Sequence, residues 1–523
     1  MASLDPLILA LDEGTTNAKA ILIDRSGKVV ARSSQPLSVS HPRPGYAEQD
    51  PTAIWHAMLA AIEHCIAQTT APLAAIAISN QRESVLAWDR ETGQPVSPLV
   101  SWQCRRSDDF CEQLARQGHA ELVRSTSGLA LDPMFSAGKM RWILDQLPDG
   151  QARAVNGEVC LGTVDSWLLW QLTGGKVFAT DASNAARTQL MDLRTCQWST
   201  ALTEVFNIPL AALPDIRPSA GLFGETTAHG SLPAGIAIMS MIGDSHAALF
   251  GQGGFTPGLV KATLGTGSSL MTPMARQVGS SAGLATTVAW HTEAPTYALE
   301  GNIVHTGGAV SWAARLLGAA DDIDALAAEA AALPDNGGVY FVPALGGLGA
   351  PHWNSQARGL ICGLTEASSR AHILRATLEA IAYQIRDVFD AMEQDSPDPL
   401  GELWVDGGAT RNEWLMQFQA DLLQRPVIRS LSPEVSAIGA AHLAGFALRW
   451  WPDEDALANL ERPRQRYEPR RNAVPELYEH WQQALKRTVM SSSLDRPVIH
   501  FQEPIGCLIF LLAQAQWGAG VGG

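Results

Sequence analysis

Short apolar runs alternate with polar turns in the first part of the chain. Residues 7–11 are apolar and meet a polar, glycine-containing turn at residues 12–16, and a second apolar run covers residues 20–23. Runs of this length and composition predict a strand, a tight turn and a second strand. Residues 53–66 repeat apolar positions with helical spacing, which predicts a helix, and residues 73–79 predict the next strand.

The same order of elements returns later in the chain. Apolar runs over residues 236–242, 260–264 and 403–405 each end in a glycine-containing turn, and residues 371–393 have the pattern of a long amphipathic helix. Helices alternating with strands predict an α/β fold, in which polar residues at the carboxyl ends of strands usually bind ligands. The glycine-rich turns in both parts of the chain indicate two related halves.

Length and composition narrow the class of protein. The chain has 523 residues, enough for two domains, with a change of domain expected near residue 250. The net charge of −16 argues against a nucleic-acid partner, which would need clustered Lys and Arg. The apolar stretches are shorter than the roughly 20 residues that span a bilayer, so we expect no membrane span. The residues after about 490 read as a poorly ordered tail.

Cysteine usage indicates a reducing environment. The chain has seven cysteines at scattered positions and no C-x-x-C pair. This spacing is not typical of a disulfide framework or a structural zinc site. The first residues lack a basic stretch followed by a long apolar run, and we expect them to lead into the first strand rather than to form a signal peptide. We therefore expect a cytoplasmic protein.

The turn at residues 12–16 has the chemistry of an anion site. Gly14 allows a sharp turn, and backbone N–H groups and the hydroxyls of Thr15 and Thr16 are suitable donors to phosphate oxygens. Asp12 is a suitable ligand for Mg²⁺ between two phosphates. The alternative is an ordinary hairpin turn with an Asx hydrogen bond, which the turn alone does not exclude.

Two more glycine turns, at residues 265–267 and 407–409, are similar and equally unspecific on their own. The chain contains neither a Walker A motif nor a G-x-G-x-x-G motif. A P-loop or Rossmann nucleotide site is therefore disfavoured, and a nucleotide site here requires a different fold.

Together these patterns carry a resemblance to a known family. The turns at 12–16, 265–267 and 406–409 resemble, in order, the two phosphate loops and the adenosine loop of the actin-like ATPase fold. Residues 134–146 (MFSAGKMRWILDQ) and 359–379 (GLICGLTEASSRAHILRATLE) resemble the two signatures of the FGGY carbohydrate kinases. Blocks such as ALDEGTT, PGYAEQDP, SNQRES and LGTVDSWLLW resemble the glycerol kinases within that family.

The resemblance implies two RNase H-like α/β domains with a cleft between them. Residues 1–250 would form the domain with the acceptor site and first phosphate loop, residues 251–490 the nucleotide-binding domain, and residues 491–523 the tail. The implied reaction is ATP- and Mg²⁺-dependent phosphorylation of a terminal hydroxyl of a small polyol. Glycerol, giving glycerol 3-phosphate, is the first candidate, and a four- or five-carbon polyol or ketose is the alternative. A homodimer or homotetramer is compatible with the resemblance.

The resemblance also assigns the acceptor site. Asp244, at the end of an apolar strand, matches the family's catalytic aspartate and a second metal ligand beside Asp12; without the resemblance, a helix N-cap would be the better interpretation. Arg82 and Glu83 would bind vicinal hydroxyls, the alternative being a solvated ion pair of little energetic weight. Trp102 would pack its ring against the carbon chain of the acceptor.

The nucleotide contacts follow from the same match. The predicted residues lie on the first loop, on the second loop and around the adenosine end; they are Thr15, Thr16, Asn17, Thr266, Gly307, Ser311, Gly408 and Asn412. Ser311 stands where glycerol kinases usually have glutamine.

Three acceptor positions differ from the glycerol kinases. Phe135 replaces a tyrosine, Ser245 a glutamine and Ser269 a phenylalanine. Two of these changes are from large to small, so the pocket is expected to be larger and more polar at one end. Either the acceptor is longer than glycerol, or the pocket repacks around glycerol itself.

Other classes of protein fit less well. A non-catalytic sugar-binding protein of this fold would be expected to lack Asp12 or Asp244, and an actin-like ATPase or chaperone would lack the Arg82–Glu83 pair and both signatures. A pentulose kinase of the same family remains the serious alternative.

Overall fold

Two mixed β-sheets form the two halves of the molecule. A computed structural model describes residues 5–470 and 475–491. The first sheet has the order β13-β14-β5-β1-β2-β3 and the second the order β17-β18-β16-β15-β21-β22-β23. The first comprises β1 (Leu7–Glu13), β2 (Asn17–Ile23), β3 (Val29–Pro36), β5 (Leu73–Asn80), β13 (Ala220–Glu225) and β14 (Ala237–Gly243). The second comprises β15 (Val260–Leu264), β16 (Ser268–Met274), β17 (Ala285–His291), β18 (Pro295–Ile303), β21 (Leu403–Asp406), β22 (Val427–Ser430) and β23 (Arg464–Tyr467).

The two sheets share one connectivity. In the first, the antiparallel hairpin β1–β2 is followed by β5 and β14, which run parallel to β1. In the second, the antiparallel hairpin β15–β16 is followed by β21 and β22, which run parallel to β15. The predicted strands and the two related halves are confirmed. Because the parallel strands point the same way, their carboxyl ends gather at one edge of each sheet.

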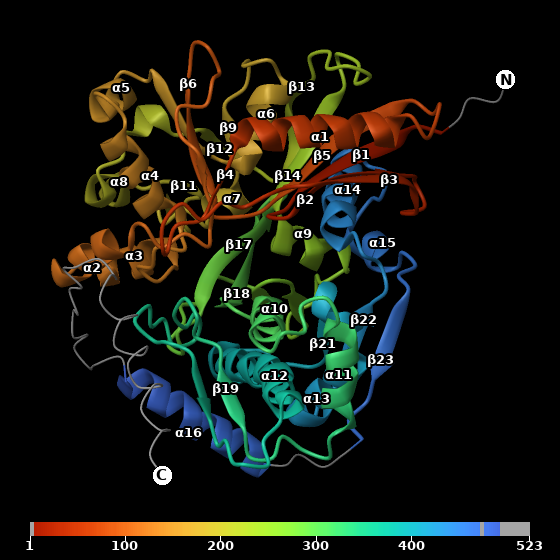
Figure 1. Ribbon diagram of the computed structural model, residues 1–523. Helices are drawn as coiled ribbons and strands as arrows, with labels where there is room; N and C mark the ends of the chain where they lie inside the picture. Colours follow the sequence, from red (N-terminus) through yellow and green to blue (C-terminus); the bar gives the residue numbers. More distant parts are fainter. Residues whose placement is uncertain (1–4, 471–474, 492–523) are drawn as a thin grey trace, which may run out of the picture.

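Helices cover the sheets (Figure 1). In the first half they are α1 (Pro51–Ile66), α2 (Asp108–Arg116), α3 (Ala120–Ser127), α4 (Ser136–Gln146), α5 (Gly150–Val155), α6 (Val164–Leu172), α7 (Ala182–Ala185), α8 (Thr200–Phe206) and α9 (Asp244–Gly251). In the second half they are α10 (Gly307–Leu316), α11 (Ile323–Ala332), α12 (Arg370–Asp395), α13 (Glu413–Leu423), α14 (Val435–Ala447), α15 (Glu454–Ala458) and α16 (Pro475–Ser491). The predicted helices 53–66 and 371–393 match α1 and α12.

Short elements complete the chain. A four-stranded sheet has the order β4-β7-β6-β8, formed by β4 (Glu48–Gln49), β6 (Val85–Asp89), β7 (Leu99–Val100) and β8 (Val159–Thr163). The remaining pieces are β9 (Ala179–Asp181), β10 (Met191–Asp192), β11 (Gln197–Trp198), β12 (Asp215–Arg217), β19 (Tyr340–Val342), β20 (Leu360–Cys362), η1 (Leu210–Ala212) and η2 (Gly408–Arg411). None of the helices in the described ranges is long and apolar enough to cross a membrane. The predicted tail covers residues 491–523. Residue 491 is the last residue of α16, and residues 492–523 lie outside the described residues.

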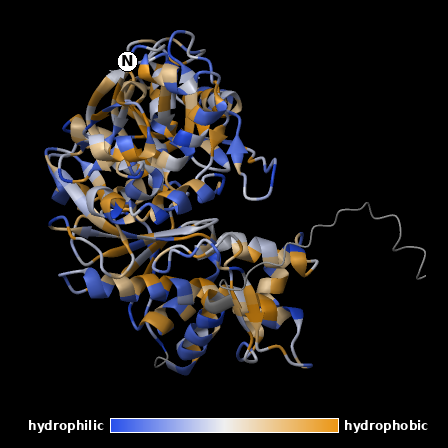
Figure 2. Ribbon diagram, turned by 90° about the vertical axis from the view of Figure 1, so that its left-hand side faces the viewer, coloured by the Kyte–Doolittle hydropathy of each residue, from blue (hydrophilic) through white to orange (hydrophobic). Residues whose placement is uncertain are grey.

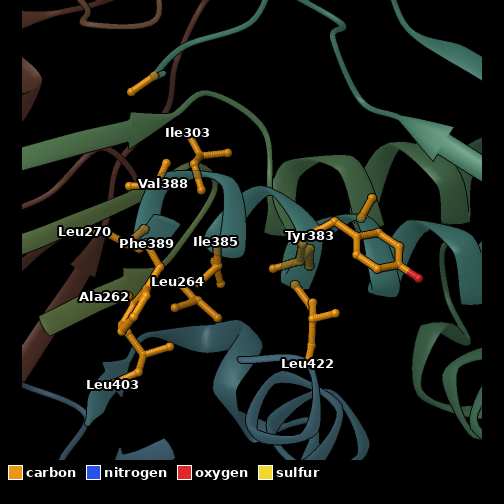
Figure 3. Close-up of a cluster of buried hydrophobic side chains, with 14 of the residues drawn as sticks. Ala262, Leu264, Leu270, Ile303, Tyr383, Ile385, Val388, Phe389, Leu403 and Leu422 are labelled. Carbon is orange, nitrogen blue, oxygen red and sulfur yellow. The ribbon is translucent and has the colours of Figure 1, made fainter. Parts of the chain in front are cut away.

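Alternating side chains of β1 face two different cores. Leu7, Leu9 and Leu11 pack with α1 and α6, whereas Ile8 and Ala10 pack with α9 and α14. A strand buried on both faces requires an unbroken apolar run, as the sequence shows. In the second half, α12 lies across the sheet, and its Ile385, Val388 and Phe389 lie near Leu264, Leu270 and Leu403 of the strands (Figure 3). Figure 2 shows the two halves from the side, with hydrophilic residues spread over the outer helices and loops.

Helix α14 joins the two halves. It follows β22 of the second sheet but packs against β1, β5 and β14 of the first (Figure 1). The Oγ atom of Ser240 in β14 donates a hydrogen bond of 2.8 Å to the carbonyl oxygen of Ala440 in α14. At Gly439 the helix touches α9 so closely that an added Cβ atom would lie 1.7 Å from the carbonyl oxygen of Ala247. The close approach of α9 and α14 therefore requires glycine at position 439.

Substitution of Gly439 by alanine is expected to force α9 and α14 apart. The added methyl group meets backbone atoms, which cannot rotate away, so the free energy of unfolding should fall by about 1–3 kcal/mol or more. Chemical denaturation measures the change. Gly279→Ala is the matched control, because its added Cβ atom has nothing within 4 Å. Equal stability of the two variants would contradict this account of the helix crossing.

Candidate active site

The carboxyl ends of β1, β5 and β14 bring the predicted acidic residues together. Asp12 is opposite Ser79 of β5, and its Oδ1 atom accepts a 2.9 Å hydrogen bond from the Ser79 hydroxyl. Its Oδ2 atom lies 3.7 Å from Nζ of Lys19. The N–H of Gly14 donates to the carbonyl oxygen of Asn17 at 3.0 Å, which closes the turn. The chain therefore does form a hairpin here, as the alternative interpretation required, and the hairpin presents Asp12 at the sheet edge.

Asp244 lies in the first turn of α9, and Gly243 is the N-cap residue. The interpretation of Asp244 as an N-cap is therefore wrong. Its Oδ1 atom is 3.2 Å from Nε of Arg82, and 37% of its side chain is exposed. Desolvation by the surrounding protein raises the pKa of Asp244 to about 6; Arg82 opposes the rise, and the charges of Glu83 and Asp12 add to it. A carboxylate with such a pKa is suited to accept a proton near neutrality.

Arg82 and Glu83 form a buried network and not a solvated pair. Both are 5% exposed, and neither pairs with the other. Nη1 of Arg82 lies 2.8 Å from Oε1 of Glu300, which belongs to β18 of the second half. Oε1 of Glu83 lies 2.6 Å from Nε of Arg187. The interpretation as a solvated ion pair is therefore wrong.

Glu300 is the centre of this network. It is fully buried, and its Oε2 atom lies 2.6 Å from Nη1 of Arg187, while Oε1 contacts Arg82. The two guanidinium groups outweigh the effect of burial and hold the pKa of Glu300 well below its usual range. Burial lowers the pKa of Arg82, but the carboxylates of Glu300, Glu83 and Asp244 outweigh it and hold this pKa above its usual value. One carboxylate of the second half thus lies between two arginines of the first half.

Aromatic side chains line the space beside this network. The ring of Phe135 lies 5.0 Å from the guanidinium carbon of Arg187 and 5.8 Å from the ring of Trp353. Trp102 belongs to the same cluster, and its Nε1 atom donates a 3.0 Å hydrogen bond to Oγ1 of Thr15 in the first glycine turn. The predicted acceptor and phosphate residues are therefore in direct contact through this bond.

A large cavity adjoins the network on the side of the second half. Its volume is about 1530 Å³, and it reaches from the first glycine turn to α10, α11 and η2. Five of the predicted nucleotide residues of the second half and one of the first line it: Thr16, Thr266, Gly307, Ser311, Gly408 and Asn412. Thr15 and Asn17 are outside this lining, as are Arg82, Glu83, Phe135 and Asp244. The cavity therefore brings together most of the residues predicted to bind the nucleotide, whereas these predicted acceptor residues lie outside its lining.

Glycine residues give the cavity walls their shape. A Cβ atom on Gly307 would lie 2.6 Å from the carbonyl oxygen of Gly265, and one on Gly407 would lie 2.5 Å from that of Leu264. Gly407 also has a φ of +96°. These turns therefore need glycine to bring their backbones together, and their N–H groups border a cavity large enough for a nucleoside triphosphate.

Comparison with known proteins now assigns the fold and the family. The chain matches the FGGY family of carbohydrate kinases in its N-terminal domain over residues 7–251 and in its C-terminal domain over residues 260–448. This protein belongs to the FGGY carbohydrate kinases. The fold expected from the resemblance, two RNase H-like domains of the actin-like ATPase type, is confirmed.

Individual FGGY relatives differ in their acceptors. An apulose kinase of Pectobacterium atrosepticum is 52% identical over 487 residues, which are 92% of this chain and 98% of the relative. A glycerol kinase of Thermotoga maritima is 44% identical over 492 residues, with the same coverage. A crystal structure of Plasmodium falciparum glycerol kinase with ADP superposes with a TM-score of 0.83 at 30% identity, covering 94% of this chain and 99% of that one. These relatives thus share the family but are named for two different acceptors, apulose and glycerol.

The carboxylates of this FGGY kinase suit a magnesium ion. In the described part of the chain, no group of three or more His, Cys, Asp and Glu side chains forms a metal centre. Magnesium, however, is commonly held by one or two carboxylates together with phosphate oxygens. Asp12 and Asp244 lie at the same sheet edge, and after burial and Glu83 the charge of Asp12 also raises the pKa of Asp244. A divalent cation bound with the phosphates would relieve that repulsion.

Several residues at the site were not predicted from sequence. They are Arg187, the pair Glu300 and Asn302 on β18, and Trp353; Arg187 contacts both residues of β18, and Trp353 lies near Phe135, so these contacts join segments far apart in the chain. The fully buried Lys139 lies within the first signature, and its position in that signature was the one available signal. Charged residues inside apolar strands, such as Glu300 in β18, are a general sign of a buried network.

Lys139 positions two walls of the acceptor site. Its ammonium group donates to the carbonyl oxygens of Met134 at 2.5 Å and Ser101 at 3.5 Å, next to Phe135 and Trp102. Burial lowers the pKa of Lys139 to about 8, partly offset by Glu83. The ammonium group is thus held by backbone carbonyls at a cost in solvation.

The cost of burying the Lys139 ammonium group is expected to appear in the pH dependence of the free energy of unfolding. Because the folded pKa of Lys139 lies below the unfolded value, the unfolded chain binds more protons between about pH 8 and about pH 10, and stability rises with pH in that window. Relative to Lys139→Met, the wild type should therefore gain about 1–3 kcal/mol across it. Denaturant unfolding at several pH values measures the difference, with Lys28→Met as the exposed control. A constant difference would show that Lys139 titrates normally.

Proposed function

We propose that this FGGY kinase transfers the γ-phosphoryl group of ATP to a terminal hydroxyl of a small ketose of about five carbons. The observation that carries the proposal is the change of side chain at three predicted acceptor positions, where Ser245 and Ser269 are small and Phe135 lacks a hydroxyl. The 52% identity to an apulose kinase supports it, because that relative is named for a ketose acceptor. We place the acceptor and the first phosphate loop on residues 1–250 and the nucleotide on residues 251–490.

Asp244 is the proposed general base. Its carboxylate is partly exposed at the edge where β14 ends, and its pKa of about 6 leaves it ionised at neutral pH. It would accept the proton of the attacking hydroxyl while Arg82 keeps the carboxylate in place at 3.2 Å. General bases of this kind typically contribute a factor of roughly 10²–10⁴ to the rate.

Glu83, Trp102 and Phe135 would hold the acceptor. Arg187 occupies one oxygen of Glu83, which leaves the other oxygen to accept a hydrogen bond from an acceptor hydroxyl. The aromatic cluster offers an apolar surface to the carbon chain. With Ser245 beside the base, these groups orient the terminal hydroxyl toward the nucleotide, which accounts for much of the catalysis expected in phosphoryl transfer.

The cavity would hold ATP, with the N–H groups of the glycine turns toward the phosphates. The proposed contacts are Thr15, Thr16, Asn17 and Thr266 for the phosphates, and Gly307, Ser311, Gly408 and Asn412 for the adenosine end. Asp12 and Asp244 would hold Mg²⁺, which when bound neutralises charge on the phosphates. Exclusion of water depends on how tightly the two halves close over the site.

Glycerol is the second candidate acceptor. Arg82 and Glu83, which are suited to bind vicinal hydroxyls, are both present, and glycerol kinases are 42–45% identical to this chain. Under this alternative, the changes at Phe135, Ser245 and Ser269 are repacking around the same triol.

An ADP-release assay across a panel of acceptors tests the proposal. The panel is glycerol, dihydroxyacetone, erythritol, D- and L-threitol, ribitol, ribulose, xylulose and apulose, each with Mg²⁺ and ATP. We expect a five-carbon ketose to give the highest kcat/KM, and Asp244→Asn to lower kcat by roughly 10²–10⁴-fold. The exposed Asp321→Asn is the matched control and should keep wild-type activity.

The possible results separate the alternatives. The highest kcat/KM with glycerol would establish the second candidate and reject the ketose. Near wild-type turnover by Asp244→Asn would reject the assignment of the base. No ADP release with any acceptor would reject the proposed function as a whole.

A further inference from the structure

We propose that Ser269 and Asn302 form a specificity-determining wall that recognises a polar substituent that glycerol lacks. The inference rests on the proposed function and names two residues of the second half that determine the acceptor class. Ser269 was noticed in the sequence as a change in size, whereas Asn302 carries no signal in the sequence. Their contacts show what this wall offers an acceptor.

The sheet register places the two side chains side by side. Ser269 of β16 is directly opposite Asn302 of β18, and Glu300 is two residues before Asn302 on the same strand. Because side chains two residues apart on a strand face the same side, Glu300 and Asn302 lie on one face, next to Ser269. This face is the one that meets Arg82 and Arg187 of the first half.

Hydrogen bonds fix the orientation of both polar groups. The Ser269 hydroxyl donates to Oε1 of Glu300 at 2.5 Å, so its oxygen can only accept from an acceptor molecule. The Oδ1 atom of Asn302 accepts from Nη2 of Arg187 at 2.8 Å, and its Nδ2 atom donates to Glu300 at 2.9 Å. The amide therefore cannot rotate without losing both bonds, and it retains one further N–H to donate.

The two wall residues are less enclosed than the ionic groups behind them. Glu300 and Arg187 are fully buried, whereas Ser269 and Asn302 keep exposed fractions of 6% and 8%. The serine oxygen and the second amide N–H are therefore the groups that this wall has left to offer an acceptor. An acceptor oxygen beside one fixed donor and one fixed acceptor is a hydroxyl, or a hydroxyl next to a carbonyl.

Arg187 links this wall to the residues proposed to bind the acceptor. Its Nε atom contacts Glu83 while its Nη2 atom contacts Asn302, so one planar guanidinium separates the two side chains. Glu83 would bind the hydroxyls that glycerol and a ketose share. Asn302 and Ser269 are then available to an oxygen further along the chain, which a three-carbon triol does not supply.

Ratios of kcat/KM for a five-carbon ketose and for glycerol test the wall. The variants are Asn302→Ala, Asn302→Ser and Ser269→Ala, with Ser269→Phe to fill the space. Loss of a hydrogen bond from a site built for it is expected to lower the ketose-to-glycerol ratio by about 10- to 100-fold, and Ser269→Phe should lower it most. Thr287→Val on the neighbouring strand β17 is the buried control, and it should leave the ratio unchanged.

The comparison of ratios separates specificity from folding. A variant that only disturbs the Glu300 network loses activity with both acceptors by the same factor, and an unchanged ratio in all four variants would overturn the inference. Activity of the wild type with a ketose, combined with such unchanged ratios, leaves the proposed function standing and rejects the wall alone. Absence of activity with every acceptor rejects the proposed function and the wall together.

Discussion

The structure depends on one buried carboxylate between two arginines. Glu300 belongs to the second half, and Arg82 and Arg187 belong to the first, so their ion pairs cross the seam between the halves. Buried charges are costly to desolvate, and such an arrangement is tolerated only when every charge has partners. Here the partners also contact residues of the proposed acceptor site: Arg82 contacts Asp244, and Arg187 contacts Glu83. The ion pairs that hold the two halves together therefore also fix the positions of the proposed acceptor residues.

The helix crossing of α9 and α14 supports the same seam. Asp244 begins α9, and α9 is held by α14 at Gly439, where only a hydrogen atom fits between the two backbones. The proposed base thus lies at the start of α9, and α9 packs closely against α14. Rigid packing on one side and an ionic network on the other give the acceptor residues fixed positions, as phosphoryl transfer between two bound substrates requires.

Local patterns predicted most of the fold and about half of the site. The strands, α1 and α12 follow from apolar periodicity, whereas Asp12, Arg82 and Asp244 stand at strand ends and were assigned roles through the resemblance to the FGGY kinases. Arg187, Glu300 and Asn302 were missed because their function arises from long-range pairing between segments more than 100 residues apart. Helix α14 shows the same limit, because it follows a strand of the second sheet but packs against the sheet of the first half.

A double-mutant cycle between Arg187 and Glu300 tests this account most directly. The free energy of unfolding is measured for the wild type, Arg187→Met, Glu300→Met and the double variant. Each single change removes one of the two ionic partners of a buried charge and should cost up to about 3–5 kcal/mol. The double variant should be more stable than the sum of the two losses predicts, by at least about 1 kcal/mol. Additive losses would contradict the account, because they would show that the two charges do not depend on each other.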